Sequence, residues 1–252
     1  MKQFKKFILR EGFFSFLIKC SDVLLRPFGI SFFSYIKFKK ANFFQNRISF
    51  KKKKIFTHIY KKKFWKKEHS LSGKGSELHH NLDYIKNLKN LLIKLKINLF
   101  FDVPCGDMSW MPHVIKDLNI QYNGGDIVKE LIDRNKKQYP NLNFYKFDLK
   151  KDFFPKVQLV HIRDCLFHFS FKDIKKTINN LKKSKIRYVL ITSHKSLILK
   201  NYDIATGDFR YLDLEKKPFN FPKPIVRLRD YSFGNFPRYV NLWKLKHLPR
   251  YI

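Results

Sequence analysis

The segment that decides the fold is Leu99-Phe100-Phe101-Asp102-Val103-Pro104-Cys105-Gly106-Asp107. Its apolar run ends in an acid, and a tight turn containing glycine leads into a helix-like segment, Met108–Leu118. A second apolar segment then ends in Gly124-Gly125-Asp126-Ile127. A buried strand, a turn, a helix and an acid at the tip of the next strand form the layout of a nucleoside-binding α/β unit.

The turn departs from the dinucleotide-binding fingerprint, in which three glycines cradle a pyrophosphate. Here it has one glycine, Gly106, and two carboxylates, Asp102 and Asp107. Carboxylates that face a ligand repel phosphate, so this turn suits a nucleoside with a positive centre. That chemistry indicates S-adenosylmethionine as the cofactor.

Five motifs in the chain support a specific family resemblance. They are Ser70–Ser76, Asp102–Met111, Gly124–Val128, Arg163–His168 and Pro218–Pro222. On these motifs the chain resembles class I S-adenosylmethionine-dependent methyltransferases. It is most similar to a bacterial group with Asp-x-Pro-Cys-Gly-Asp and Arg-Asp-Cys-Leu-x-His motifs, mostly of unassigned substrate. The resemblance covers roughly residues 64–252.

Strand-like and helix-like segments alternate five times, which predicts a parallel sheet with helices on both faces. The expected parallel strands are Asn98–Val103, Gln121–Asp126, Asn143–Phe147, Val157–Arg163 and Arg187–Thr192, with closing strands at Ile225–Leu228 and Tyr239–Leu245. A helix is expected at 78–96, and Ser170 with Asp173 resembles a capping box that opens another. The predicted fold class is therefore α/β, a Rossmann-like, seven-stranded, mostly parallel sheet with an antiparallel last strand.

Acids occupy the carboxyl ends of four of the expected strands, where such sheets bind ligands. They are Asp102, Asp126, Asp148 and Asp164. A single acid at a strand end is usually a turn former or a helix cap, but four in register indicate a site.

The family resemblance implies roles for the first turn. Asp102, Gly106 and Asp107 would contact the methionine part of the cofactor, with Asp102 near its ammonium group. Pro104 and Cys105 belong to the same cofactor-binding turn.

The resemblance also implies the contacts of the adenosine part. Asp126 would accept hydrogen bonds from the ribose hydroxyls, and Ile127 would pack beside the adenine. Asp148 would accept from the adenine amino group, and Leu149 would stack on the ring. Arg163 would close the fourth strand beside the transferring methyl group.

Methyl transfer to a neutral oxygen or nitrogen needs alignment and, for a hydroxyl, a base. Asp164 and His168 are the candidate catalytic residues, and His194 is a third. The alternative for His168 is a structural, partly buried histidine at the start of a helix.

Two segments outside the alternation are candidate walls of the site. The Ser70–Ser76 loop precedes the first strand and is a candidate flap over the cofactor, with Trp65. Residues 196–224 carry too many turn formers for a helix. This irregular insert is where acceptor recognition is expected, and the insert, which carries Arg210, is expected to fold over Asp164 and His168.

The chain carries 53 Lys and Arg against 20 Asp and Glu, a formal charge of +33. Residues 1–63 are especially basic, with acids only at Glu11 and Asp22. We expect this N-terminal extension to be helical and separate from a methyltransferase domain at 64–252. It is interpreted as a lid, a segment that binds an anionic membrane, or a segment that binds nucleic acid. Part of the lysine excess is also typical of an AT-rich genome.

No uncharged stretch of residues 1–63 approaches the roughly 20 apolar residues of a membrane span, and no signal-peptide cleavage site follows its apolar part. Three scattered cysteines lack metal spacing, so no metal site is predicted and a reducing compartment is expected. We therefore expect a cytoplasmic protein, peripheral to the inner membrane face if residues 1–63 bind lipid.

The leading functional hypothesis is methyl transfer to an oxygen or nitrogen of a small molecule or glycan. The alternative is a nucleic-acid-binding protein or RNA methyltransferase that grips phosphates with its lysines, although no known RNA-binding module is present. A third alternative is an inactive, membrane-associated methyltransferase fold. The sequence leaves the acceptor and the oligomeric state open.

Overall fold

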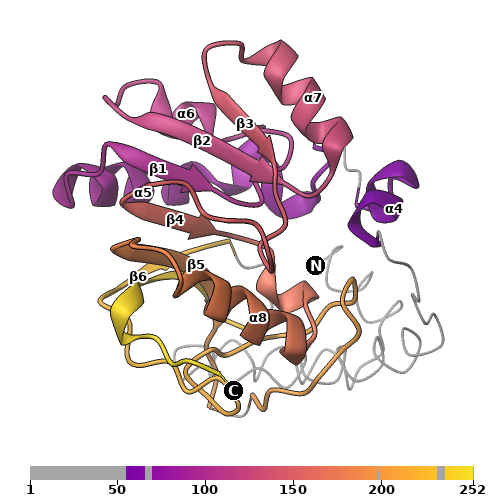
Figure 1. The fold of residues 1–252 in the computed structure, drawn as a ribbon, viewed down its shortest axis with the longest axis vertical. Helices are drawn as coiled ribbons and strands as arrows, with labels where there is room; N and C mark the ends of the chain where they lie inside the picture. The colour runs from indigo at the N-terminus through magenta and orange to yellow at the C-terminus, as the bar shows by residue number, and fades with distance from the viewer. Residues whose placement is uncertain (1–54, 66–69, 198, 232–235, 252) are drawn as a thin grey trace, which may run out of the picture.

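A computed structural model describes residues 55–65, 70–197, 199–231 and 236–251. The extension interpreted as a lid, membrane-binding or nucleic-acid-binding segment, residues 1–63, lies outside this range except for residues 55–63. One seven-stranded sheet runs through the molecule in the order β3-β2-β1-β4-β5-β7-β6 (Figure 1). Strands β1 to β5 are parallel, and β7 is antiparallel to both of its neighbours. The predicted Rossmann-like fold class is confirmed.

The strands are β1 (Leu99–Asp102), β2 (Gln121–Asp126), β3 (Asn143–Lys146), β4 (Leu159–Ile162), β5 (Tyr188–His194), β6 (Val226–Arg229) and β7 (Arg238–Lys244). Their ends differ from the predicted ones by at most two residues. Apolar runs bounded by turn formers therefore located the sheet well.

The helices are α4 (Ile55–Lys61), α5 (Leu82–Lys94), α6 (Pro112–Ile115), α7 (Lys129–Gln138) and α8 (Phe171–Leu181). Short 3₁₀ turns occur at Lys74–Ser76, Leu78–His80, Leu166–His168 and Leu245–His247. The predicted cap of α8 is present, because Ser170 Oγ accepts a 3.2 Å hydrogen bond from the Asp173 amide.

Two predicted helices are shorter than expected. The segment Met108–Leu118 contains only the single turn of α6, since Met108 has a φ of 59° and regular helix begins at Pro112. The helix predicted at 78–96 begins at Leu82, after a 3₁₀ turn, and ends at Lys94. Lys96, two residues later, has a φ of 52°. Backbone in the left-handed region interrupts helix at both places.

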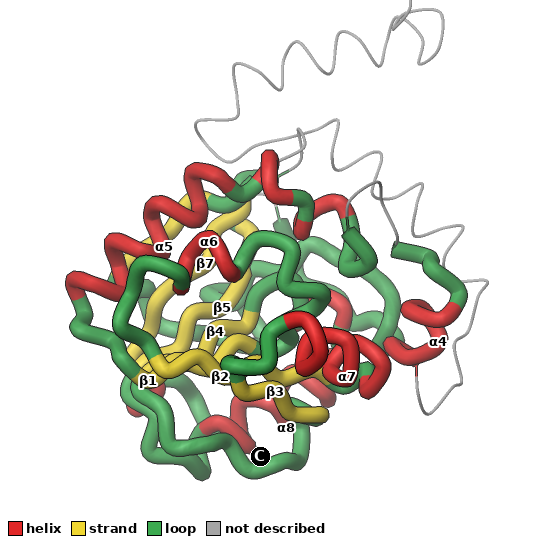
Figure 2. The backbone as a smooth tube through the Cα atoms, turned by 90° about the horizontal axis from the view of Figure 1, so that it is seen from above, coloured by secondary structure: helices red, strands yellow, loops and turns green. Residues whose placement is uncertain are grey.

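Neighbouring strand residues point to opposite faces of the sheet and supply two separate cores. Phe100, Leu159 and Leu190 pack with α5 and α6 on one face. On the other face Phe101 and Val160 pack with α8 and with the insert after β5. Figure 2 shows α5 and α6 on one side of the sheet and α8 on the other.

Residues 195–225 form no regular helix or strand, as predicted, apart from position 198, which lies outside the described residues. This insert still contributes buried side chains, among them Leu212, Leu214 and Phe219. In the described part of the chain, no helix is long and apolar enough to cross a membrane.

Candidate active site

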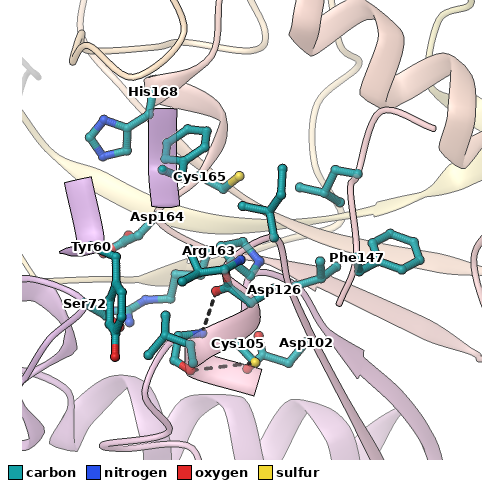
Figure 3. Close-up of a pocket in the computed structure, with 18 of the residues that line it drawn as sticks. Tyr60, Ser72, Asp102, Cys105, Asp126, Phe147, Arg163, Asp164, Cys165 and His168 are labelled. Atoms are coloured by element: carbon teal, nitrogen blue, oxygen red, sulfur yellow. Dashed lines mark hydrogen bonds between the residues drawn. The ribbon is translucent and has the colours of Figure 1, made fainter. Parts of the chain in front are cut away.

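A pocket lies at the carboxyl ends of β1, β2 and β4 (Figure 3). Nine of the ten predicted cofactor-binding residues line it: Asp102, Pro104, Cys105, Gly106, Asp126, Ile127, Asp148, Leu149 and Arg163. The candidate catalytic residues Asp164 and His168 line it too, whereas Asp107 does not. The fold thus brings together residues that are up to 66 positions apart because parallel strands end at one edge.

Gly106 occupies the tightest part of the turn after β1, with a φ of 57°. Its amide donates to Asp126 Oδ2 at 3.2 Å, and its carbonyl accepts from Asn135 Nδ2 of α7 at 2.7 Å. A Cβ atom here would lie 2.7 Å from Ser72 Oγ. Glycine therefore allows both the left-handed turn and the close approach of the Ser70–Ser76 loop.

Asp126 ends β2 and is 6% exposed. Besides Gly106, the Val128 amide donates to its carboxylate, to Oδ1 at 2.9 Å. Burial raises the pKa of Asp126 to about 6, although these two amides act in the opposite direction. An ionised carboxylate has about four acceptor positions, so those that the backbone amides do not occupy remain for hydroxyl donors of a ligand.

Asp102 belongs to a buried chain of polar side chains that sequence reasoning missed. His161 Nδ1 lies 2.7 Å from Asp102 Oδ1, and Tyr84 Oη lies 2.8 Å from His161 Nε2. Tyr122 Oη donates to Asp102 Oδ2 at 3.0 Å. With His161 donating from Nδ1 and accepting from Tyr84, the Asp102 carboxylate is held in place at the pocket wall.

Asp107 fastens the Ser70–Ser76 loop instead of lining the pocket. Its Oδ2 accepts from Ser70 Oγ at 2.8 Å and from the Leu71 amide at 2.6 Å. The Asp107 amide in turn donates to Ser72 Oγ at 3.0 Å. Leu71, Ser72 and Ser76 then form part of the pocket wall, where the flap was expected.

The adenosine end predicted for the pocket is largely apolar. Ile127, Leu131, Phe147 and Leu149 line this region, and Asp148 stands among them with Oδ1 accepting from the Lys150 amide at 3.1 Å. Such a surface fits the faces of an aromatic base, with one carboxylate at its edge.

Arg163 is held on several sides. Its Nε and Nη2 donate to the two carboxylate oxygens of Asp230 at 3.1 and 2.7 Å, and Nη2 also donates to Asn81 Oδ1 at 2.6 Å. Its guanidinium lies 4.8 Å from the ring centres of Tyr84 and Trp110. With its donors engaged in this way, the side chain forms a rigid wall of the pocket.

Asp164 follows β4 with a φ of 55°, a left-handed conformation that aspartate adopts more readily than most residues. Its Oδ2 accepts from Tyr231 Oη at 2.8 Å, and its Oδ1 forms an ion pair with Arg238. Both carboxylate oxygens of Asp164 are therefore engaged by neighbouring side chains.

His168 lines the same pocket and keeps one ring nitrogen available. Its Nδ1 donates to the Asp208 carbonyl at 2.7 Å, which leaves Nε2 as the acceptor. The imidazole packs on Trp65, with ring centres 4.9 Å apart. Burial lowers the pKa of His168 to about 4, so the ring is neutral at pH 7.

Helix α4 contributes pocket residues from within the predicted extension. Phe56 and Tyr60 line the pocket, and Ile55 and Ile59 are buried. The sequence feature that could have indicated this helix is the spacing of these four residues, which recur one helical turn apart.

The insert packs against His168 through the Asp208 carbonyl, but the Arg210 side chain does not line the space beside His168 and Asp164. The Arg210 side chain is buried, with Nη1 donating to the Phe169 carbonyl at 2.6 Å and the guanidinium over Phe171. The neighbouring Phe209 and Tyr211 line the space beside His168 instead, because side chains alternate along extended backbone.

Cys105 and Cys165 are buried free thiols in the pocket lining. Burial raises the pKa of both thiols, which keeps them protonated. They are inert fillers of the wall, not nucleophiles.

Among the described residues, a group that could hold a metal ion is formed by Glu77, His79 and His80, whose ligand atoms lie within 4.8 Å of one another. None of the three lines the pocket.

No protein-family model matches the chain, and no curated protein matches its sequence. Among solved structures, it is similar to magnesium protoporphyrin IX methyltransferase (ChlM) from Synechocystis PCC 6803 with bound SAH. The TM-score is 0.51 at 11% identity, over 73% of this chain and 92% of that one. It also resembles the methyltransferase domain of bacterial CtHen1, with a TM-score of 0.48 at 11% identity over 66% and 99% of the two chains. The similarity to ChlM shows that this chain has the class I methyltransferase fold.

Proposed function

We propose that this protein transfers a methyl group from S-adenosylmethionine to an oxygen or nitrogen of a small molecule or glycan. The observation that carries the proposal is the set of three carboxylates, Asp102, Asp126 and Asp148, at the ends of β1, β2 and β3 around one pocket. Together with the methyltransferase fold, this set matches the cationic and hydroxyl-bearing parts of that cofactor.

The lining residues fit the cofactor part by part. The acceptor positions of Asp126 that the backbone amides leave open would receive the ribose hydroxyls, and Asp102 presents negative charge to the ammonium group. Ile127 and Leu149 offer apolar contact to adenine, with Asp148 to accept from its amino group. When bound, the cofactor supplies a methyl group activated by a sulfonium.

The residues beside His168 would act on the acceptor. His168 presents a neutral Nε2 acceptor, whereas Asp164 is occupied by Tyr231 and Arg238. We therefore assign the role of base, for a hydroxyl acceptor, to His168, and the role of positioning Tyr231 and Arg238 to Asp164.

Calorimetric titration of the full chain with S-adenosylmethionine, S-adenosylhomocysteine and NAD tests the proposal. Asp126→Ala should weaken S-adenosylmethionine binding by about 1.5–3 kcal/mol, the scale of hydrogen bonds to a charged group. Asp133→Ala, which removes a half-exposed carboxylate from the outer side of α7, is the matched control and should bind normally. Unchanged affinity in Asp126→Ala, or tighter binding of NAD, would contradict the proposal.

A further inference from the structure

A second pocket adjoins the first one beside His168. Trp65, Ser72, Asp164 and His168 line both pockets. A molecule in the second pocket therefore lies next to a molecule in the first. Under the proposed function, on which this inference rests, the second pocket is the place of the methyl acceptor.

Six aromatic side chains line it: Trp65, Phe167, Phe209, Tyr211, Tyr231 and Phe236. Several meet edge to face, with ring centres 5.4 Å apart for Phe167 and Phe209, 5.3 Å for Phe209 and Tyr211, and 4.8 Å for Tyr211 and Phe236. These contacts fix the orientation of the rings. The pocket thus presents preformed flat surfaces for a ring-shaped ligand.

The charged side chains in the described lining, Asp164 and Arg238, neutralise each other. They form an ion pair, and Tyr231 Oη bridges them by donating to Asp164 at 2.8 Å and accepting from Arg238 at 2.6 Å. Arg238 Nε also donates to Asp230 at 3.1 Å. A phosphate, carboxylate or ammonium group would find no unpaired counter-charge on these residues.

Two histidines that line this space, His168 and His194, carry opposite hydrogen-bonding groups on Nε2. Because His168 Nδ1 donates to the Asp208 carbonyl, its Nε2 is an acceptor. The Leu212 amide donates to His194 Nδ1 at 3.2 Å, so His194 carries its proton on Nε2 and is a donor. Burial lowers the pKa of His194 to about 3 and that of His168 to about 4, which keeps both rings neutral at pH 7. Both rings pack against Phe167.

We propose that this pocket binds a neutral acceptor whose ring stacks on the aromatic walls, and that the methylated atom is a hydroxyl oxygen on that ring. The acceptor hydroxyl donates to His168 Nε2, and an oxygen of the same molecule accepts from His194 Nε2–H. A protonated amine has no acceptor for His194, and a carboxylate has no donor for His168, so the pair selects hydroxyl compounds.

The reaction balances with these groups. The hydroxyl oxygen forms a bond to the methyl carbon, the carbon–sulfur bond breaks, and its electron pair stays on sulfur as a neutral thioether. The hydroxyl proton moves to His168 Nε2, and the imidazolium later releases it to water. The products are a methyl ether and S-adenosylhomocysteine.

The test uses 4-nitrophenyl β-D-glucopyranoside, its glucuronide and its 2-amino-2-deoxy analogue as probes of the full chain saturated with S-adenosylhomocysteine. Saturation-transfer NMR should show the neutral glucoside binding about fivefold or more tightly than either charged analogue. The protons that receive most saturation show whether the sugar or the aromatic ring lies on the walls. His194→Ala should weaken glucoside binding about fivefold, the effect of one hydrogen bond, whereas His247→Ala, an exposed histidine, should not.

Nitrogen-15 spectra of histidine-labelled protein supply a second readout that a merely structural role would not move. His168 should be the Nδ1–H tautomer, His194 the Nε2–H tautomer, and both Nε2 resonances should shift when the glucoside is added. The opposite tautomers, equal binding of a charged probe, or cofactor binding with no glucoside binding would overturn the inference while the proposed function stands. Absence of cofactor binding would instead refute the proposed function, and this inference with it.

Discussion

The unusual ionisation of Asp126 gives a stability test that needs no acceptor. Burial raises its pKa from 3.8 to about 6. The folded chain therefore holds this proton more tightly than the unfolded chain, and the stability contributed by the group is present below pH 3.8 and is lost as pH rises through 6. At about 1.4 kcal/mol per pH unit, ionisation of Asp126 lowers the free energy of unfolding by about 3 kcal/mol at neutral pH.

Asp126→Asn removes this ionisation and keeps the size of the side chain. Between about pH 4.5 and 7.5 the free energy of unfolding of the native protein should fall by about 2 kcal/mol. The free energy of unfolding of Asp126→Asn should not show this fall. Urea unfolding of both proteins at several pH values measures the difference, with Asp133→Asn as the control for a change on the surface. Parallel stability profiles for the native chain and Asp126→Asn would refute the reasoning.

The same carboxylate should make cofactor binding depend on pH. Hydroxyl donors favour the ionised form, so the affinity of the native chain for S-adenosylmethionine should rise as pH rises through about 6. Asp126→Asn should bind more weakly and should lack this rise. Titration calorimetry at about pH 5 and 7.5 would expose an error here if both proteins showed the same pH dependence.

Three further substitutions test the walls of the pocket. Asp107→Ala should remove two hydrogen bonds that hold the Ser70–Ser76 loop and destabilise the closed loop by about 1.5–3 kcal/mol. Limited proteolysis within the loop should become faster, and an unchanged cleavage rate would count against Asp107 as the anchor. His161→Leu should lower the free energy of unfolding by about 3 kcal/mol, because the buried Asp102 loses a partner, and a loss below about 1 kcal/mol would argue against the buried chain. Arg163→Lys should cost about 2 kcal/mol by losing its two-point pairing with Asp230, and a double-mutant cycle with Asp230→Asn should show coupling if the pairing matters.

The local sequence pattern predicted the positions of the strands and of the acids at their ends, because both depend on neighbouring residues. Apolar runs located the strands, and four of the five parallel strands have an acid at the carboxyl end, so Asp102, Asp126, Asp148 and Asp164 were expected at one edge. The topology then brought them to one pocket without any further information. Their roles toward a ligand stay predictions.

Contacts between distant segments could not be predicted from such patterns. The bond between His161 and Asp102 joins residues 59 apart, and neither residue carries a periodic signal for the other. The failure at Met108–Leu118 has a different cause, because the apolar side chains have helical spacing although the backbone turns at Met108. Burial of Trp110 and Met111 in that turn produced the misleading stripe.

The pairing of Arg163 has a consequence for the order in which the molecule is made. Its carboxylate partner, Asp230, is synthesised 67 residues later, whereas its amide partner, Asn81, precedes it by 82. A nascent chain that has completed the five parallel strands but not the segment before β7 holds a guanidinium that cannot be buried without its counter-ion. The pocket wall around Arg163 therefore closes only after Asp230 has left the ribosome, so translation products truncated before Asp230 would lack a formed wall.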